Sequence, residues 1–138
     1  MAASAFNMYN NSKRYLVDGT VDLDTDTIVA RLYKNDSNAS TFTLSTSSEM
    51  TNPVATGSYA AITTVVTIND TGLSTAVDIA DLQWTASGAD MTSVQFLAIS
   101  ENGGKLICWC ALSTAAFDVT SGNTLTVTID AAGVFTMQ

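Results

Sequence analysis

Short runs of β-forming residues, separated by turn formers, are the feature that most constrains how this chain folds. Residues 124–129 show the pattern most clearly, because Leu125, Val127 and Ile129 alternate with three threonines. Successive side chains of a strand point to opposite faces, so the alternation predicts a strand with one buried and one solvated side. Threonine suits such a strand because its branched Cβ favours a pleated backbone. The 21 threonines of the chain therefore favour strands throughout.

Comparable runs recur along the whole chain. The turn signals between them include Asn102-Gly103, a pair that supplies the positive φ angles of a tight hairpin, and the stretch from Asp130 to Gly133. About eight short strands at regular spacing indicate an all-β sandwich or barrel. The runs expected to form strands are residues 27–33, 41–44, 59–68, 76–79, 82–84, 94–99, 106–111, 124–129 and 134–137.

The N-terminal region differs from the rest. Residues 2–11 are small and polar apart from three larger side chains. The composition predicts an extended N-terminal arm over residues 1–11 ahead of a single β-sandwich domain over residues 12–138. Ser12 is expected to cap one short helix over residues 13–17, closed by Gly19. We expect neither a signal peptide nor a membrane span, since no charged start with an apolar run and no sufficiently long apolar stretch occurs.

Charge and residue types argue against several function classes. The chain has 5 basic and 13 acidic residues, a net charge of −8, and no basic patch, so binding to nucleic acid or to an anionic membrane is not expected. It has no histidine, the commonest general base and metal ligand. No nucleophile motif or phosphate-binding loop is present either. We therefore predict that the protein is not an enzyme and has no catalytic residues, cofactor or metal.

The most suggestive polar cluster is Asp22, Asp24 and Asp26. Their carboxylates alternate along the chain, and oxygen ligands of this kind are what Ca²⁺ prefers. A calcium-binding EF-hand loop, however, needs glycine where this chain has Thr27 and glutamate where it has Tyr33. A solvated turn that leads into the first long strand is the favoured interpretation.

Cys108 and Cys110 flank Trp109 in an expected strand. Residues two apart in a strand have Cα atoms roughly 6.5–7 Å apart, at the limit for a disulfide. We therefore expect both cysteines to be buried and reduced, as in a protein made in a reducing cytoplasm. Trp109 then points to the opposite face. Two interpretations remain open for it, an outward-facing contact surface and the second face of a strand that is packed on both sides.

The segment from Tyr15 to Ile28, YLVDGTVDLDTDTI, resembles the opening of small virion proteins of tailed bacteriophages. The resemblance continues in weaker form at residues 82–87, at the hairpin around Asn102 and at residues 130–135. It implies a jelly-roll-like β-sandwich and the function of a capsid decoration (cement) protein. Such a protein, made in the cytoplasm of a bacterial host, is a homotrimer on the outer surface of an icosahedral head. There it bridges subunits of the major capsid protein.

We hypothesise that Phe6, Met8 and Tyr9 anchor the arm on a neighbouring subunit, with Trp109 as a further interface residue. Two other functions stay open. A tail, neck or fibre-base component of a virion has the same fold and composition as a decoration protein. A carbohydrate-binding module would instead stack an outward-facing tryptophan, Trp84 or Trp109, on a sugar ring.

Overall fold

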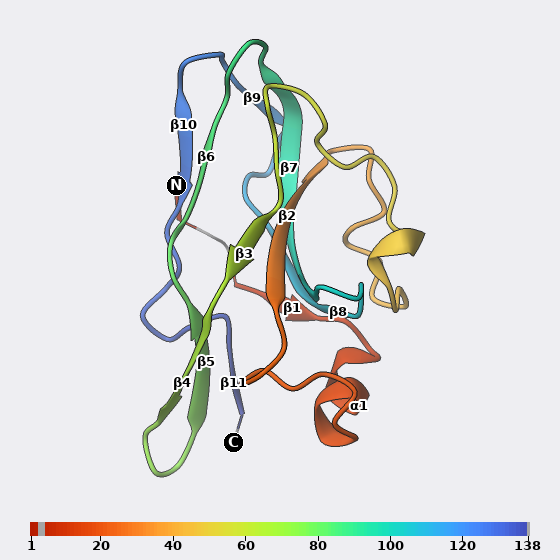
Figure 1. Ribbon diagram of the computed structural model, residues 1–138, viewed down its shortest axis with the longest axis vertical. Coiled ribbons are helices and arrows are strands. Elements are labelled where there is room, and N and C mark those ends of the chain that lie inside the picture. The colour runs from red at the N-terminus through yellow and green to blue at the C-terminus, as the bar shows by residue number, and fades with distance from the viewer. Residues whose placement is uncertain (3–4, 138) are drawn as a thin grey trace.

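The computed structural model describes residues 1–2 and 5–137, and its strands form two layers of antiparallel sheet (Figure 1). The larger sheet has the spatial order β1-β8-β7-β2-β3, and β9 also pairs with β7. Its longest strand, β7, lies between β8 and β2. The strands of this sheet are β1 (Asn7–Met8), β2 (Ile28–Lys34), β3 (Ile62–Thr64), β7 (Met91–Glu101), β8 (Leu106–Ala111) and β9 (Phe117–Val119).

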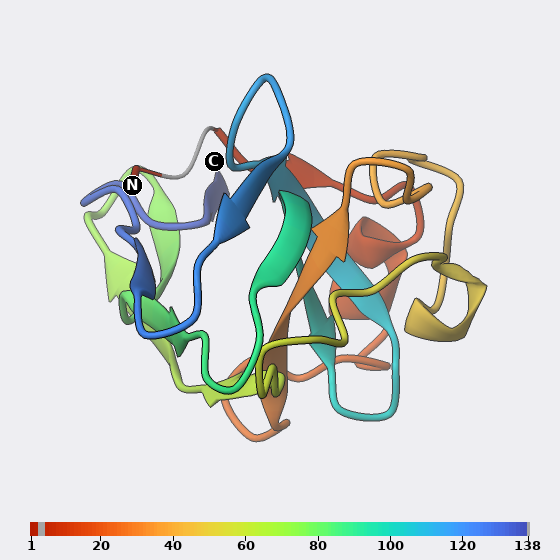
Figure 2. The same cartoon turned by 90° about the horizontal axis from the view of Figure 1, so that it is seen from above.

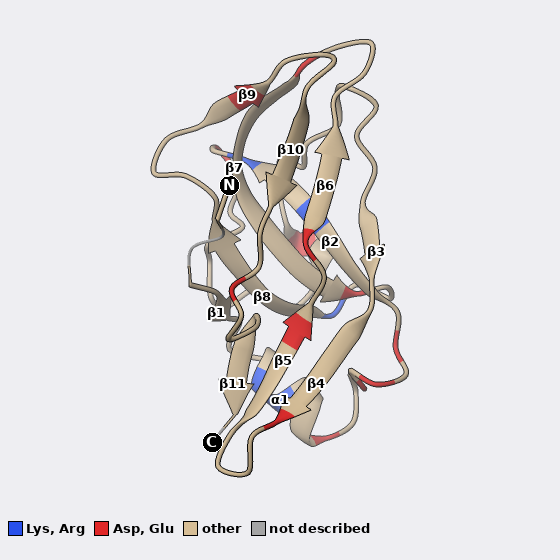
Figure 3. Ribbon diagram, turned by 90° about the vertical axis from the view of Figure 1, so that its left-hand side faces the viewer, with Lys and Arg blue, Asp and Glu red and all other residues tan. Residues whose placement is uncertain are grey.

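Two smaller sheets lie end to end and form the second layer (Figure 3). One pairs β6 with β10, and the other has the order β11-β5-β4. Only Val65 separates β3 from β4, so a nearly continuous stretch passes from the large sheet into the second layer. The strands of the second layer are β4 (Val66–Asp70), β5 (Thr75–Ile79), β6 (Leu82–Thr85), β10 (Thr124–Val127) and β11 (Phe135–Met137).

The main hydrophobic core fills the space between the two layers. Its side chains come from alternate positions of the strands, as in Leu82 and Trp84 of β6 and in Leu125 and Val127 of β10, all of them buried. The Trp84 indole Nε1 donates a hydrogen bond of 3.0 Å to the carbonyl oxygen of Ala60, so its polar atom is paired. Period-two burial of this kind is what the sequence of residues 124–129 predicts.

A second, smaller cluster covers the other face of the large sheet. Viewed from above, this sheet lies between the second layer and the segment that joins β2 to β3 (Figure 2). Ala39 and Met50 of that segment pack with Tyr33, Ala98 and Leu106 of the sheet. The middle of the large sheet is therefore buried on both faces.

The described part of the predicted N-terminal arm packs against its own chain. The Met1 ammonium donates a hydrogen bond of 2.8 Å to the Thr126 carbonyl of β10, in the second layer. Asn7 and Met8 pair with Trp109 and Cys108 of β8, in the large sheet. The N-terminal segment thus contacts both layers of the sandwich.

The predicted all-β sandwich with one short helix is confirmed. The helix α1 (Ser12–Val17) begins one residue earlier than expected, because Asn11 occupies the cap position and the Ser12 hydroxyl donates to the Tyr9 carbonyl at 2.7 Å. Gly19 follows the helix with φ +75°, the left-handed conformation expected of the residue that closes a helix. No helix within the described residues is long and apolar enough to cross a membrane.

The strands differ from expectation at several places. The described residues contain eleven strands instead of about eight, because the expected run 59–68 is divided at Val65 and because β1 and β9 carry no strong alternation. The expected strand over residues 41–44 is wrong. Turn hydrogen bonds form there instead, from the Thr41 amide to the Asn38 carbonyl and from the Leu44 amide to the Thr41 carbonyl, and the 3₁₀ turn η1 (Ser47–Glu49) follows.

Cys108 and Cys110 are free and buried in the main core, as expected. Burial raises the pKa of the Cys108 thiol well above its usual value, and the neighbouring Cys110 raises it further. Burial also raises the pKa of Cys110, to about 12. Both thiols therefore stay protonated in the folded protein at pH values at which an exposed thiol ionises.

The first prediction concerns Tyr9, whose hydroxyl donates a hydrogen bond of 2.6 Å to the carbonyl oxygen of the buried Ala39. Tyr9→Phe leaves that carbonyl without its donor, so we expect the free energy of unfolding to fall by about 1–3 kcal/mol in urea titrations. Tyr15→Phe, which keeps the ring beneath the Lys105 ammonium, is the control and should change it by less than about 0.5 kcal/mol. Equal effects of the two variants would contradict the role of the Tyr9 hydrogen bond.

The second prediction concerns stability at alkaline pH. Cysteine thiols ionise near pH 8.5 in the unfolded chain but, because their pKa is raised, remain protonated in the fold. The unfolded state therefore binds fewer protons above that pH, and stability falls as pH rises, by up to about 1.4 kcal/mol per pH unit for each thiol. Urea titrations from pH 7 to 10 should show this fall, and the double variant Cys108→Ala/Cys110→Ala should flatten it. The same decrease of stability with pH in the double variant would contradict the prediction.

Candidate interaction surface

The four predicted interface residues lie in different environments. Tyr9 is completely buried and has no surface to offer to a partner. Phe6 and Met8 are partly buried and pack against the main core. Trp109 is also partly buried, but it lies on the opposite face of the large sheet, beside the smaller cluster. The structure therefore does not bring these four side chains together into one exposed surface.

Trp109 belongs to an aromatic group on the outer face of the large sheet, formed with Phe42 and Phe96. Both phenylalanine rings meet the indole edge to face, with centroid separations of 5.6 Å for Phe42 and 6.1 Å for Phe96. The indole Nε1 is buried and, among the described residues, has no hydrogen-bond partner. Strand β8 is thus packed on both faces, the second of the two interpretations left open by the sequence. Phe42, at 45% exposed, is the outer part of this aromatic group.

The acidic cluster forms a turn that is stabilised by hydrogen bonds from its own backbone amides to its carboxylates. The Asp22 carboxylate accepts a hydrogen bond of 3.0 Å from the Asp24 amide, and the Asp26 carboxylate accepts one of 2.8 Å from the Asp22 amide. Within the described residues, no group of three or more acidic, cysteine or histidine side chains is arranged to hold a metal ion. The arrangement is that of a turn entering β2.

Two exposed carboxyl groups have a lowered pKa, and both shifts have a structural cause. The hydroxyl and the amide of Thr20 donate to Asp18, and these bonds lower the pKa of Asp18. The amides of Ser45 and Thr46 lower the pKa of Glu49 in the same way, as part of the capping of η1. Hydrogen bonds to a carboxylate favour its ionised form. Neither group is poised for acid–base chemistry near neutral pH.

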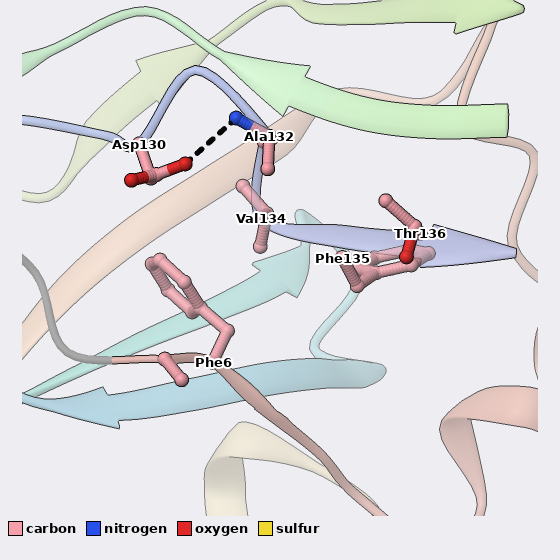
Figure 4. Close-up of a pocket in the computed structure, with 8 residues that line it drawn as sticks. Phe6, Asp130, Ala132, Val134, Phe135 and Thr136 are labelled. Carbon is pink, nitrogen blue, oxygen red and sulfur yellow. Dashed lines mark hydrogen bonds between the residues drawn. The ribbon is translucent and has the colours of Figure 1, made fainter. Parts of the chain in front are cut away.

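One hollow lies between the N-terminal segment and β11 and measures about 450 Å³ (Figure 4). The Phe6 ring points toward Val134 across it. Among the described residues that line the hollow, Asp130 is the only ionisable one, and its carboxylate accepts a hydrogen bond of 2.8 Å from the Ala132 amide. A single carboxylate that closes its own turn supplies no acid–base pair and no activated nucleophile.

Exposed apolar side chains gather at the end of the sandwich formed by α1, the acidic turn and the β11-β5-β4 sheet. We call this the open end. Val17 of α1 is 89% exposed and Met137 of β11 is 47% exposed, and both line a hollow of about 380 Å³. Leu73, in the turn between β4 and β5, is 94% exposed and lies outside the lining of that hollow. Val17 and Met137 line one hollow, and contiguous exposed apolar side chains of this kind mark interaction sites.

Sequence reasoning missed the open end, although one signal was present. Leu73 lies within the turn-forming stretch Asp70-Thr71-Gly72-Leu73-Ser74, where a large apolar side chain has no core to enter. The sequence around Val17 and Met137 does not show that these side chains are exposed, because their exposure depends on which other elements of the fold cover them.

Comparison of the chain with models of protein families, with curated proteins and with solved structures finds no match.

Proposed function

We propose that this protein is a structural component of a bacteriophage virion, a decoration (cement) protein that binds the outer surface of an icosahedral head and stabilises it by bridging subunits of the major capsid protein. The observation that carries the proposal is the open end, where Val17 and Met137 are both exposed and line the same hollow. A surface of this kind is stabilised when a partner covers it.

Composition and fold support the same function. A net charge of −8 keeps copies of the chain apart in solution until a specific surface brings them to a partner. The N-terminal segment is already packed within its own sandwich through Tyr9 and β1, so the domain completes its fold before it meets another subunit. The resemblance of residues 15–28 to small virion proteins points to an icosahedral head as the place of assembly. A homotrimer there is part of the proposal.

The geometry favours neither of the other two functions over this one. A tail, neck or fibre-base component has the same requirements for an assembly surface and differs in the number of copies. A carbohydrate-binding module needs an open aromatic platform, but Trp84 is buried and Trp109 is flanked edge-on by Phe42 and Phe96. A glycan array tests this last function directly, and no binding is expected.

The third prediction is the copy number of the chain in purified virions from its source, measured by quantitative mass spectrometry against the major shell protein. We expect copies comparable in number to the shell protein, because a decoration protein occupies repeated positions on the head. A handful of copies per particle would place the chain in the tail or neck. Complete absence from the particles would overturn the virion function.

A further inference from the structure

We propose that the open end is the docking surface of the protein and that its partner presents an apolar segment flanked by lysine or arginine side chains. This inference rests on the proposed function, because it names the contact surface and the chemistry of the shell subunit that meets it.

The centre of the surface is the hollow between α1 and β11. Val17 and Leu16 of the helix lie on one side of it and Met137 lies on the other, with Val21 and Leu23 also in its lining. Val21 is buried, whereas Leu23 is only partly so. A second hollow of about 240 Å³ shares Leu23 and extends the surface to Val65, which is 80% exposed.

The β11-β5-β4 sheet supplies one wall because its core-facing side is left partly uncovered. Ile68 of β4 is paired with Val77 of β5, and residues paired across antiparallel strands point to the same face. Val77 is buried and, two residues from Ile79 of the main core along β5, lies on the same face of the sheet as Ile79. Ile68 therefore also points to the core-facing side, yet it is 49% exposed. The far end of this sheet therefore extends beyond what the rest of the chain covers.

The three carboxylates of the acidic turn lie along one side of this apolar surface, and we call them the acidic rim. Asp22 lines the first hollow, and Asp24 and Asp26 line the second. The only ion pair among the described residues joins Arg14 to Asp18, at 3.4 Å, which leaves the three carboxylates of the acidic turn without a basic partner there. An apolar centre with an acidic rim is complementary to an apolar segment with basic flanks.

The same rim argues against other occupants. A second copy of this chain would bring Asp22, Asp24 and Asp26 against its own acidic surface, and like charges brought together oppose association. An anionic lipid surface or a nucleic acid is repelled for the same reason. A basic protein segment is the occupant whose charge the surface attracts.

The test uses the full chain and, as the probe, undecorated shells assembled from the major shell protein alone. We expect the double variant Val17→Ser/Met137→Ser to bind the shells at least about tenfold more weakly than the wild type in co-sedimentation titrations.

Asp24→Asn, which removes one rim charge, should weaken binding a few-fold at low salt and reduce the loss of affinity between about 50 and 500 mM NaCl. Asp36→Asn, a neutralisation of an exposed carboxylate next to β2 and away from the rim, is the matched control and should bind as the wild type does. Thermal unfolding of each variant checks that its fold is unchanged.

The other outcomes separate the two proposals. Failure of the wild type to bind shells overturns the decoration function and this inference with it. Wild-type binding that survives Val17→Ser/Met137→Ser but is lost in Phe42→Ser moves the docking surface to the aromatic group and overturns only the inference. Tighter binding of Asp24→Asn overturns the basic chemistry of the partner. The remaining possible occupant is a second copy of the chain, which sedimentation velocity of the free protein tests. An oligomer that the double variant Val17→Ser/Met137→Ser dissociates would assign the open end to self-association and overturn the inference.

Discussion

Burial of the large sheet on both faces is the constraint on which the rest of the structure depends. Leu97 and Ile99 of β7 face the main core, whereas Ala98 and the neighbouring strand residue Leu106 face the smaller cluster. A sheet that is apolar on both sides needs two covers, and this chain supplies them with the second layer and with the segment between β2 and β3. The buried polar side chain of β7, Ser100, is paired, because the Arg31 guanidinium donates to its hydroxyl at 2.7 Å. The N-terminal segment then contacts both layers, and Tyr9 within it is a core residue of the smaller cluster.

The parts of the fold that sequence reasoning predicted are those in which local pattern and tertiary environment agree. Residues 124–129 alternate because one face of that strand lies on the core, and the β7–β8 hairpin forms at the expected place. The positive φ angles expected of Asn102-Gly103 are wrong, because it is Gly104 that has φ +102° in this turn, and its amide donates to the Glu101 carbonyl. Residues 41–44 also alternate, but their amides bond within turns, and the Phe42 ring packs on Trp109 from outside any sheet. Strand β1 was missed because its pairing with β8 depends on a partner about a hundred residues away along the chain. Local propensity carries no information about such a partner.

The candidate site was less predictable than the fold, for a reason that lies in the lengths of the layers. Ile68 and Met137 are apolar strand residues, and their sequence neighbourhood resembles that of the buried Val77. They are exposed because the β11-β5-β4 sheet extends past the end of what covers it, a property of two elements together and not of either one. Trp109 shows the converse. Its position between two cysteines was compatible with an outward-facing side chain and with one packed on the second face of the strand. The rings of Phe42 and Phe96 pack against it, so the second face is packed.

The separation between the packed middle and the open end has a consequence for assembly. The side chains that stabilise the sandwich, such as Tyr9, Leu97 and Trp84, are buried away from the open end, so a partner that covers Val17 and Met137 need not disturb them. Docking then requires little ordering of the chain, which keeps its entropic cost low. The acidic rim acts at a different stage, because charge governs the rate of encounter and the choice of partner more than the final affinity. An apolar hollow provides the attraction, and the carboxylates of the acidic turn oppose its use by further copies of the same acidic chain.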